Sequence, residues 1–153
     1  MEPAQMTIDE ANADDAEAVW RIRYSSEVNA FARTKEIPAL SNHIQWFTKA
    51  YIGGGLNRCY VMRTAAEVIG YCRYDVDNDG SYVLSIALDP AYHGQGVGSR
   101  LLGETLAMMQ KGAEIHAIVS RTNSGSQRLL SKYGFTERTR DDAWLHMTKA
   151  IPV

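Results

Sequence analysis

Three glycines, each separated by one residue, lie between a strand-like run and a helix-like run in the segment Ala91-Tyr-His-Gly-Gln-Gly-Val-Gly98. Glycine destabilises regular structure, so this spacing indicates either a tight turn or a ligand that approaches bare backbone. The start of the following helix would expose the backbone N–H groups from His93 to Ser99, which have no partner within the helix. Together with the helix dipole, these groups favour a phosphate or a pyrophosphate. The alternative is a glycine-rich turn that only packs the helix against a sheet.

Two common nucleotide-binding motifs do not match this segment. No lysine follows the glycines, which excludes a P-loop, and the spacing Gly94-x-Gly96-x-Gly98 differs from the GxGxxG of a dinucleotide fold. A dinucleotide fold also needs an acidic residue at the end of the next strand, whereas Glu114 begins that strand. If the segment binds a phosphate, it therefore does so in another setting.

Length, charge and cysteine content limit the class of protein. The 153 residues suffice for one domain, so we expect a single domain over 1–153. The net charge of −2 argues against a nucleic-acid partner, and no apolar run is long enough for a membrane span. Cys59 and Cys72 form neither a CxxC pair nor a metal-ligand spacing, so we expect free thiols in a reducing cytoplasm and no metal. The acidic, polar N-terminus does not resemble a secretory signal.

The periodicity of apolar residues predicts a mixed α/β domain. Asn12 can cap a helix with Asp15 three residues later, and Asp77 to Gly80 form a strong hairpin-turn signal. The expected order is a strand at 6–11, helices at about 12–27 and 41–52, strands at 58–63, 68–76 and 81–88, a helix from about 96, a strand at 115–120, a helix at 124–132, and strands at 135–138 and 143–149. This order indicates an antiparallel meander followed by a strand–helix–strand crossover, which should be parallel.

Two segments resemble the acetyl-CoA motifs of the GCN5-related N-acetyltransferase superfamily. The first, from Ser85 to Leu102, has an apolar strand, a proline, a pattern similar to [QR]xxGx[GA] and a helix with paired leucines. The second, from Asn123 to Phe135, is similar to N-x-x-[AS]-x-x-L-Y-x-K-x-G-F. Both occur in the family's order and spacing, so the chain is identified as a member of this superfamily. The resemblance implies a mixed, mostly antiparallel sheet, flanked by helices, with a V-shaped splay between the parallel strands 4 and 5.

The resemblance also implies acetyl-CoA as the acetyl donor and direct attack of an amine on its thioester. The pantetheine arm would lie in the splay, and the pyrophosphate would lie on the amides that follow the first of the two strands. The expected cofactor-binding residues are Ile86, Ala87, Leu88, His93, Gly94, Gln95, Gly96, Val97, Gly98, Ser99, Asn123, Ser126 and Leu130.

Two positions depart from the family pattern. His93 stands where the family usually has arginine or glutamine, although a histidine can still cover a phosphate. Leu130 replaces the family's usual tyrosine, which often protonates the coenzyme A thiolate. Tyr133 follows three residues later and is the candidate acid, because it could lie on a nearby helix face. The alternative is that Tyr133 packs before Gly134, and water or Ser126 would then protonate the thiolate.

The acceptor amine needs a base, because it must lose a proton before it attacks. Candidates are Glu27 at the end of the first helix, His43 at the start of the second, and Ser85 on the central strand. Each has a simpler alternative: Glu27 could be a solvated residue, His43 a surface residue, and water could serve as the base. His116 and His146 lie in strand patterns, and we expect them to be structural.

The acceptor is left open by the sequence. Arg23, His43 and Trp46 are the candidate substrate-binding residues, in a pattern that resembles a branch acetylating nucleotide-linked amino sugars, near pseudaminic-acid pathway enzymes. Arg21, Arg23 and Arg33 could meet an anionic diphosphate, or they could form an ordinary solvated helix face. Antibiotics, polyamines, amino acids and protein N-termini are other acceptors. The lost tyrosine also allows a different class of protein, a catalytically inactive acetyl-CoA-binding sensor. We expect a cytoplasmic monomer or homodimer with a small-molecule amine substrate.

Overall fold

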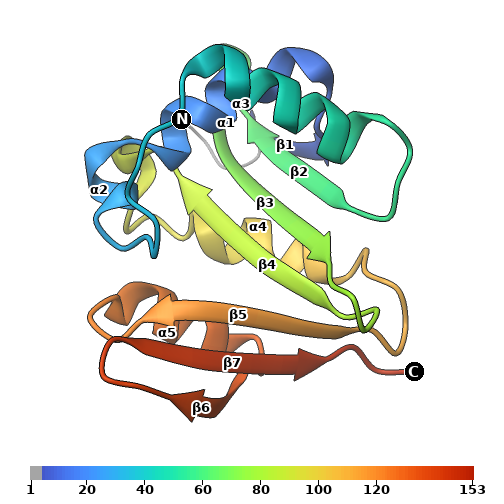
Figure 1. The fold of residues 1–153 in the computed structure, drawn as a ribbon, viewed down its shortest axis with the longest axis vertical. Coiled ribbons are helices and arrows are strands. Elements are labelled where there is room, and N and C mark those ends of the chain that lie inside the picture. Colours follow the sequence, from blue (N-terminus) through green and yellow to red (C-terminus); the bar gives the residue numbers. More distant parts are fainter. Residues whose placement is uncertain (1–4) are drawn as a thin grey trace.

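The structure, a computed structural model, describes residues 5–153. These residues form a seven-stranded sheet with helices on both faces (Figure 1). The strands are β1 (Thr7–Glu10), β2 (Arg58–Arg63), β3 (Val68–Val76), β4 (Tyr82–Leu88), β5 (Glu114–Ser120), β6 (Thr136–Arg140) and β7 (Trp144–Ala150), in the sheet order β1-β2-β3-β4-β5-β7-β6. The helices are η2 (Ala13–Asp15), α1 (Ala16–Arg23), α2 (Ser26–Asn29), α3 (Leu40–Phe47), η3 (Thr48–Ile52), η4 (Pro90–Tyr92), α4 (Val97–Leu106) and α5 (Ser124–Lys132).

Strands β4 and β5 are parallel neighbours in an otherwise antiparallel sheet. They pair at Tyr82–Ile115 and Val83–His116, near the N-terminal ends of both strands. Beyond these two pairs the strands diverge toward their C-terminal ends, and Figure 1 shows the gap between the ribbons widening along them. The predicted mixed sheet with a V-shaped splay between strands 4 and 5 is therefore confirmed. We call this feature the β4–β5 split.

Two hydrophobic cores lie on opposite faces of the sheet because successive side chains of a strand point to opposite sides. On one face, Tyr74 of β3 packs in the same buried cluster as Leu101 of α4. On the other face, Tyr71 of β3 packs with Ile22 of α1 and Phe47 of α3. We call these surfaces the α4 face and the α1 face of the sheet. A residue's position along β3, β4 or β5 thus determines which face its side chain reaches.

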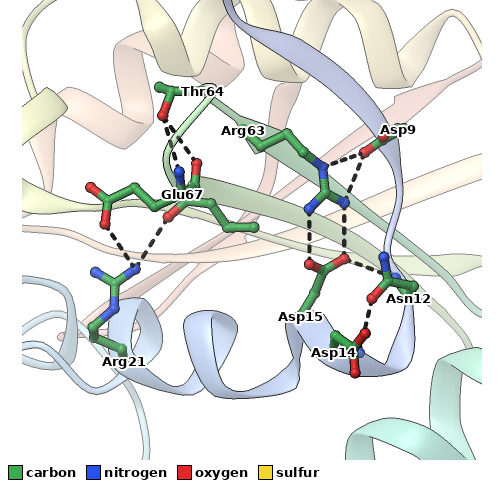
Figure 2. A network of polar contacts seen from close by, with 9 residues as sticks. Asp9, Asn12, Asp14, Asp15, Arg21, Arg63, Thr64 and Glu67 are labelled. Carbon is green, nitrogen blue, oxygen red and sulfur yellow. Dashed lines mark hydrogen bonds and ion pairs between the residues drawn. The ribbon is translucent and has the colours of Figure 1, made fainter.

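The start of α1 is held to the first two strands by a polar network (Figure 2). The Asn12 side chain accepts a hydrogen bond from the Asp14 amide, and the Asn12 amide donates to Asp15 Oδ2, both at 2.9 Å. Arg63 of β2 donates to both carboxylate oxygens of Asp15 at 3.0 Å and to Asp9 of β1 at 3.1 Å. The predicted cap of Asn12 and Asp15 is confirmed, and its carboxylate also joins α1 to β1 and β2.

The first helix is shorter than the sequence predicts. Helix α1 ends at Arg23, and Ser25 adopts an extended ψ of 148° before the short helix α2. The Ser25 hydroxyl donates to the Ile22 carbonyl at 2.8 Å, so it takes up a backbone acceptor at the helix end. The prediction that Glu27 ends the first helix is therefore wrong, because Glu27 lies in α2.

The other elements lie close to their predicted positions. Helix α3 begins at Leu40, and η3 continues it with a π-helical turn up to the glycines at 53–55. Helix α5 spans the predicted residues 124–132. Within residues 5–153, no helix is long and apolar enough to cross a membrane.

Candidate active site

The β4–β5 split leaves one edge of β4 open. From Leu84 to Leu88, β4 pairs with β3 on one side but has no paired residue on β5. On that side, the backbone carbonyl groups can accept hydrogen bonds from an extended ligand, and the backbone amides can donate hydrogen bonds to it. The ligand would then pair with β4 as a neighbouring strand would. Along this stretch the side chains of Leu84 and Ile86 belong to the α4 face, whereas Ser85 and Ala87 alternate with them toward the α1 face.

The glycine segment forms a tight loop at the C-terminal end of β4. Gly94 and Gly96 have φ angles of +76° and +78°, which side chains other than glycine rarely adopt. Gly98 lies close to β4, because a Cβ atom there would approach the Leu88 side chain to 3.4 Å. The three glycines therefore combine two left-handed turns with a close helix–strand contact.

Within residues 5–153, the amides from Gly94 to Ser99 donate no hydrogen bond. They surround the N-terminus of α4, where the helix dipole favours an anion. His93 differs from the prediction, since its amide donates to the Pro90 carbonyl at 3.2 Å. Its Nε2 atom lies 3.1 Å from the Leu88 carbonyl oxygen. The row of open amides thus begins at Gly94, one residue later than the sequence predicts.

Helix α5 approaches the same end of α4. Asn123 caps α5, its Oδ1 accepting from the Ser126 amide at 3.2 Å, and Leu130 is buried in the core of the α4 face. The Tyr133 hydroxyl donates to the Ser99 carbonyl at 2.7 Å and lies 2.9 Å from Ser99 Oγ. Tyr133 therefore holds α5 to the first turn of α4, and it reaches the loop even though Leu130 turns inward.

The two other predicted catalytic residues, Glu27 and Ser85, lie on different elements, α2 and β4. Glu27 is exposed on α2 and accepts a hydrogen bond from the Ser26 hydroxyl at 2.6 Å. That hydrogen bond lowers the pKa of Glu27, which makes its carboxylate a weaker base. Ser85 lies beside the β4–β5 split, opposite Arg73 of β3.

His43 and Trp46 belong to an aromatic cluster on the α1 face. His43 is 4% exposed, so the alternative of a surface residue is wrong. Its ring lies between 5.5 and 6.4 Å from the rings of Tyr24, Trp46 and Phe47. Burial lowers the pKa of His43, and its Nε2 atom has no hydrogen-bond partner within residues 5–153. Trp46 is 45% exposed and presents the open side of this cluster.

Three polar residues beside this cluster were not predicted. Arg73 Nη1 donates to Asp75 Oδ2 and, at 3.0 Å, to the Tyr51 hydroxyl, which in turn donates to Asp75 Oδ1 at 2.5 Å. The Arg73 guanidinium also lies 5.4 Å from the centre of the Trp46 ring. Arg73 and Asp75 are charged residues at alternate positions of a largely buried strand, and this pattern was the available signal.

Two of the three arginines proposed for a diphosphate, Arg21 and Arg23, have partners within the protein. Arg21 donates to Asp89 at 2.8 Å and to the Val68 carbonyl at 3.2 Å (Figure 2 shows it beside Glu67). Arg23 donates to Asn29 at 2.9 Å and to the carbonyl of residue 34 at 3.2 Å. These contacts hold α1 to the segments around it, so neither guanidinium points freely at a ligand.

Two cavities bear on the predicted site. A cavity of about 430 Å³ lies between β1, η3 and the start of β2, and none of the predicted site residues lines it. A smaller one of about 200 Å³ lies on the α1 face of β5 and β7, lined by Arg33, Ile118, Thr139, Arg140, Asp141, Trp144 and His146. Among residues 5–153, no group of three or more histidines, cysteines or acidic residues could hold a metal ion.

Residues 5–136 match the family model described as the acetyltransferase (GNAT) domain. The match covers most of the chain, which therefore belongs to this family of N-acetyltransferases. A curated relative, an uncharacterized protein of Mycobacterium leprae (strain TN), is 43% identical over 82 residues, which is 50% of this chain. The chain spans only 23% of the length of that relative.

Solved structures with the same fold include two acetyltransferases and one putative acetyltransferase. The yncA protein from Salmonella typhimurium, solved with acetyl-CoA, is 20% identical, with a TM-score of 0.82 over 97% of this chain and 95% of that chain. A phosphinothricin acetyltransferase from Sinorhizobium meliloti, in complex with acetyl-CoA, is 20% identical, with a TM-score of 0.82 over 97% and 89%. Spermidine N-acetyltransferase from Vibrio cholerae, with CoA and spermine, is 15% identical, with a TM-score of 0.78 over 96% of each chain. These likenesses confirm the fold.

Proposed function

We propose that this protein transfers an acetyl group from acetyl-CoA to a primary amine of a small molecule, by direct attack of the amine on the thioester. The observation that carries the proposal is the β4–β5 split, which opens one edge of β4 beside a row of unpaired amides. An extended pantetheine arm would pair with the edge from Leu84 to Leu88, and a pyrophosphate would accept hydrogen bonds from Gly94 to Ser99. Acetyl-CoA, which is present in two of the structural relatives, has both parts.

The residues around this edge would contact the pantetheine either through their backbone or through their side chains. Ile86, Ala87 and Leu88 would contact the pantetheine through their backbone. Asn123 and Ser126, at the start of α5, would lie across the gap from them. His93 covers the Leu88 carbonyl and would have to turn away when the arm enters.

Protonation of the leaving thiolate needs a donor other than residue 130, because Leu130 has no proton to give. Tyr133 is the tyrosine that lies at this end of α5, and it is one candidate acid. Its hydroxyl already donates to the Ser99 carbonyl, so it would have to exchange that partner for the thiolate. We therefore expect water or the Ser126 hydroxyl to protonate the thiolate.

The acceptor would lie on the α1 face of the split, between Trp46, Arg73 and Ser85. An exposed indole beside a guanidinium suits an amine that also carries a polar or anionic group. The narrower proposal of a nucleotide-linked amino sugar loses support, because Arg21 and Arg23 are engaged within the protein. The named acceptors of the relatives, phosphinothricin and spermidine, are unlike each other, so we propose the class of small primary amines.

A screen of amines tests the proposal. The purified protein would be mixed with acetyl-CoA and with amino acids, polyamines, aminoglycosides, UDP-amino sugars and N-terminal peptides in turn, and released thiol would be measured. We expect thiol release with at least one small primary amine and acetyl-CoA binding by calorimetry. Tight binding without release for any amine would favour the acetyl-CoA sensor, which the buried Leu130 allows. Absence of acetyl-CoA binding would overturn both the N-acetyltransferase and the acetyl-CoA sensor proposals.

A further inference from the structure

Two histidines and a glutamate form a chain of contacts on the open part of the α1 face. His116 of β5 and His146 of β7 stack with ring centres 5.0 Å apart, and His116 Nδ1 lies 2.7 Å from His146 Nε2 in a hydrogen bond. Glu114 Oε1 lies 2.7 Å from His116 Nε2, off the line of a hydrogen bond. We call Glu114, His116 and His146 the β5–β7 histidine chain.

The histidine chain begins at the vertex of the β4–β5 split. Val83 and His116 are the last residues that pair β4 with β5. Ile115 and Ala117 are buried on the α4 face, so His116 and Ile118 point to the α1 face, the face of Ser85. His146 pairs with Ile118 on the diverging part of β5. The chain therefore lies on the side of the split from which the acceptor would approach.

The contacts favour one arrangement of protons in the neutral chain. A carboxylate oxygen 2.7 Å from His116 Nε2 favours a proton on that nitrogen, which leaves Nδ1 as an acceptor. His146 Nε2 must then donate to His116 Nδ1, so its own proton lies on Nε2. The remaining nitrogen, His146 Nδ1, carries a free lone pair. His146 is therefore placed as a base, with His116 and then Glu114 positioned to orient it and to take up its positive charge.

We propose that the β5–β7 histidine chain is the general base of the acetyl transfer, with His146 Nδ1 as the atom that takes up the proton of the acceptor ammonium. This inference rests on the proposed function. As the N–H bond of the acceptor breaks, water carries the proton to His146 Nδ1, and His146 passes its Nε2 proton to His116 Nδ1. The positive charge then lies on His116 beside the Glu114 carboxylate. The lone pair of the freed amine forms the new C–N bond, the C–S bond of the thioester breaks, and the second proton lost by the nitrogen goes to the leaving thiolate.

The route for water is the smaller cavity. His146 and Ile118 line this space of about 200 Å³, together with Arg33 of the segment before α3. A space of this size holds several water molecules and opens beside the diverging part of β5. His146 therefore needs no direct contact with the acceptor.

Charges on two neighbouring elements influence the histidine chain. Arg138 of β6 donates to Glu114 at 3.2 Å, and Asp79 of the β3–β4 turn interacts electrostatically with His116. Burial, and then His116 and Arg138, lower the pKa of His146, while Glu114 opposes them. His146 is therefore neutral at about pH 7 and ready to accept a proton.

The pH dependence of kcat/KM in the variant His146→Gln tests whether the histidine chain acts as the general base. Loss of a general base should lower kcat/KM for the best acceptor by about 100-fold at about pH 7. The deficit should shrink as the pH approaches the pKa of the acceptor, since the free amine no longer needs a base. Glu114→Gln should lower kcat/KM less, by about tenfold, and move the acidic limb of the profile to lower pH. Thr148→Ser, which changes the cross-strand neighbour of His116, should leave the profile unchanged.

Two results would overturn the inference: an unchanged acidic limb in His146→Gln, or a deficit that is equal at every pH. Acetyl-CoA binding by calorimetry shows that each variant is folded. Long-range proton–nitrogen NMR of the imidazole rings tests the chain without any acceptor. It should show Nε2–H tautomers for both His116 and His146, and His116 should change in Glu114→Gln. Other tautomers would contradict the histidine chain, whereas failure of the amine screen would contradict the proposed function.

Discussion

Val83 and His116 form the last pair between β4 and β5, and the open edge of β4 begins just beyond it. On one side of this vertex are the open edge of β4 and the glycine loop. On the other are Arg73, Trp46 and the histidine chain. A split in a sheet thus gives two ligands access to the same few backbone groups from opposite faces.

The first prediction concerns the left-handed backbone of the glycine loop. Gly96→Val should raise the Kd of acetyl-CoA at least about tenfold, because a φ of +78° costs a side-chain-bearing residue about 1–2 kcal/mol and the loop would move its amides to relieve it. Calorimetry measures this change. Gly54→Val is the matched control, since Gly54 has a φ of +81° with nothing within 4 Å, in a loop away from the split. Equal Kd values for wild type and Gly96→Val would remove the loop from the cofactor site.

A second prediction separates packing from acid catalysis at Tyr133. Tyr133→Phe should lower the free energy of unfolding by about 1 kcal/mol, because the hydroxyl loses its hydrogen bond to the Ser99 carbonyl. Urea denaturation measures this loss. We expect kcat to fall by less than about tenfold, since the proton is already engaged. A fall in kcat of about 100-fold, with stability unchanged, would identify Tyr133 as the acid instead.

The third prediction concerns the acceptor face. Arg73→Lys should raise the KM of the acceptor by about tenfold and leave the Kd of acetyl-CoA unchanged, because an ammonium cannot both bridge Tyr51 and Asp75 and lie over the Trp46 ring. Steady-state kinetics with the best amine of the screen provide the measurement. Arg58→Lys, on β2, is the control. An unchanged acceptor KM in Arg73→Lys would place the acceptor elsewhere.

The two carboxylates that Arg63 contacts should differ in their effects. Asp15→Asn should lower the free energy of unfolding by about 2 kcal/mol, because Asp15 is 5% exposed and accepts two bonds from the guanidinium (Figure 2). Asp9→Asn removes an exposed partner of the same guanidinium and should cost less than about 1 kcal/mol. Denaturation curves of the two variants test the difference. Equal losses would show that burial does not decide the effect.

A fifth prediction follows from the buried imidazole of His43. Burial lowers its pKa in the folded state, so the unfolded state binds more protons as the pH falls through the ordinary histidine range. The free energy of unfolding should therefore decrease between about pH 7 and about pH 5. His43→Phe should reduce this decrease without abolishing it, because His146 also has a lowered pKa. Denaturation at both pH values provides the test, and an identical decrease in the variant would contradict it.

The order of the elements and the glycine loop could be predicted because their signals are local. Asn12 and Asp15 cap a helix three residues apart, and Gly94 and Gly96 have positive φ angles within one short loop. Each depends on residues that are neighbours in the chain. The end of α1 was not predicted, because only the extended conformation of Ser25 separates α1 from α2, and no residue pattern marks it.

The residues proposed for the acceptor side of the split were harder to predict from the sequence, because they come from α3, β3, β5 and β7. His43 resembles a surface residue in the sequence, and its burial depends on how α3 packs onto α1. His116 and His146 are thirty positions apart, and the register of β5 with β7 brings their rings together. The sequence alone determined the family, the strand and helix order and the loop for an anionic group, since these follow from short contiguous patterns. Only the tertiary structure decided which side chains share the α1 face of the split, because strand register and helix packing arise from contacts among residues far apart in the chain.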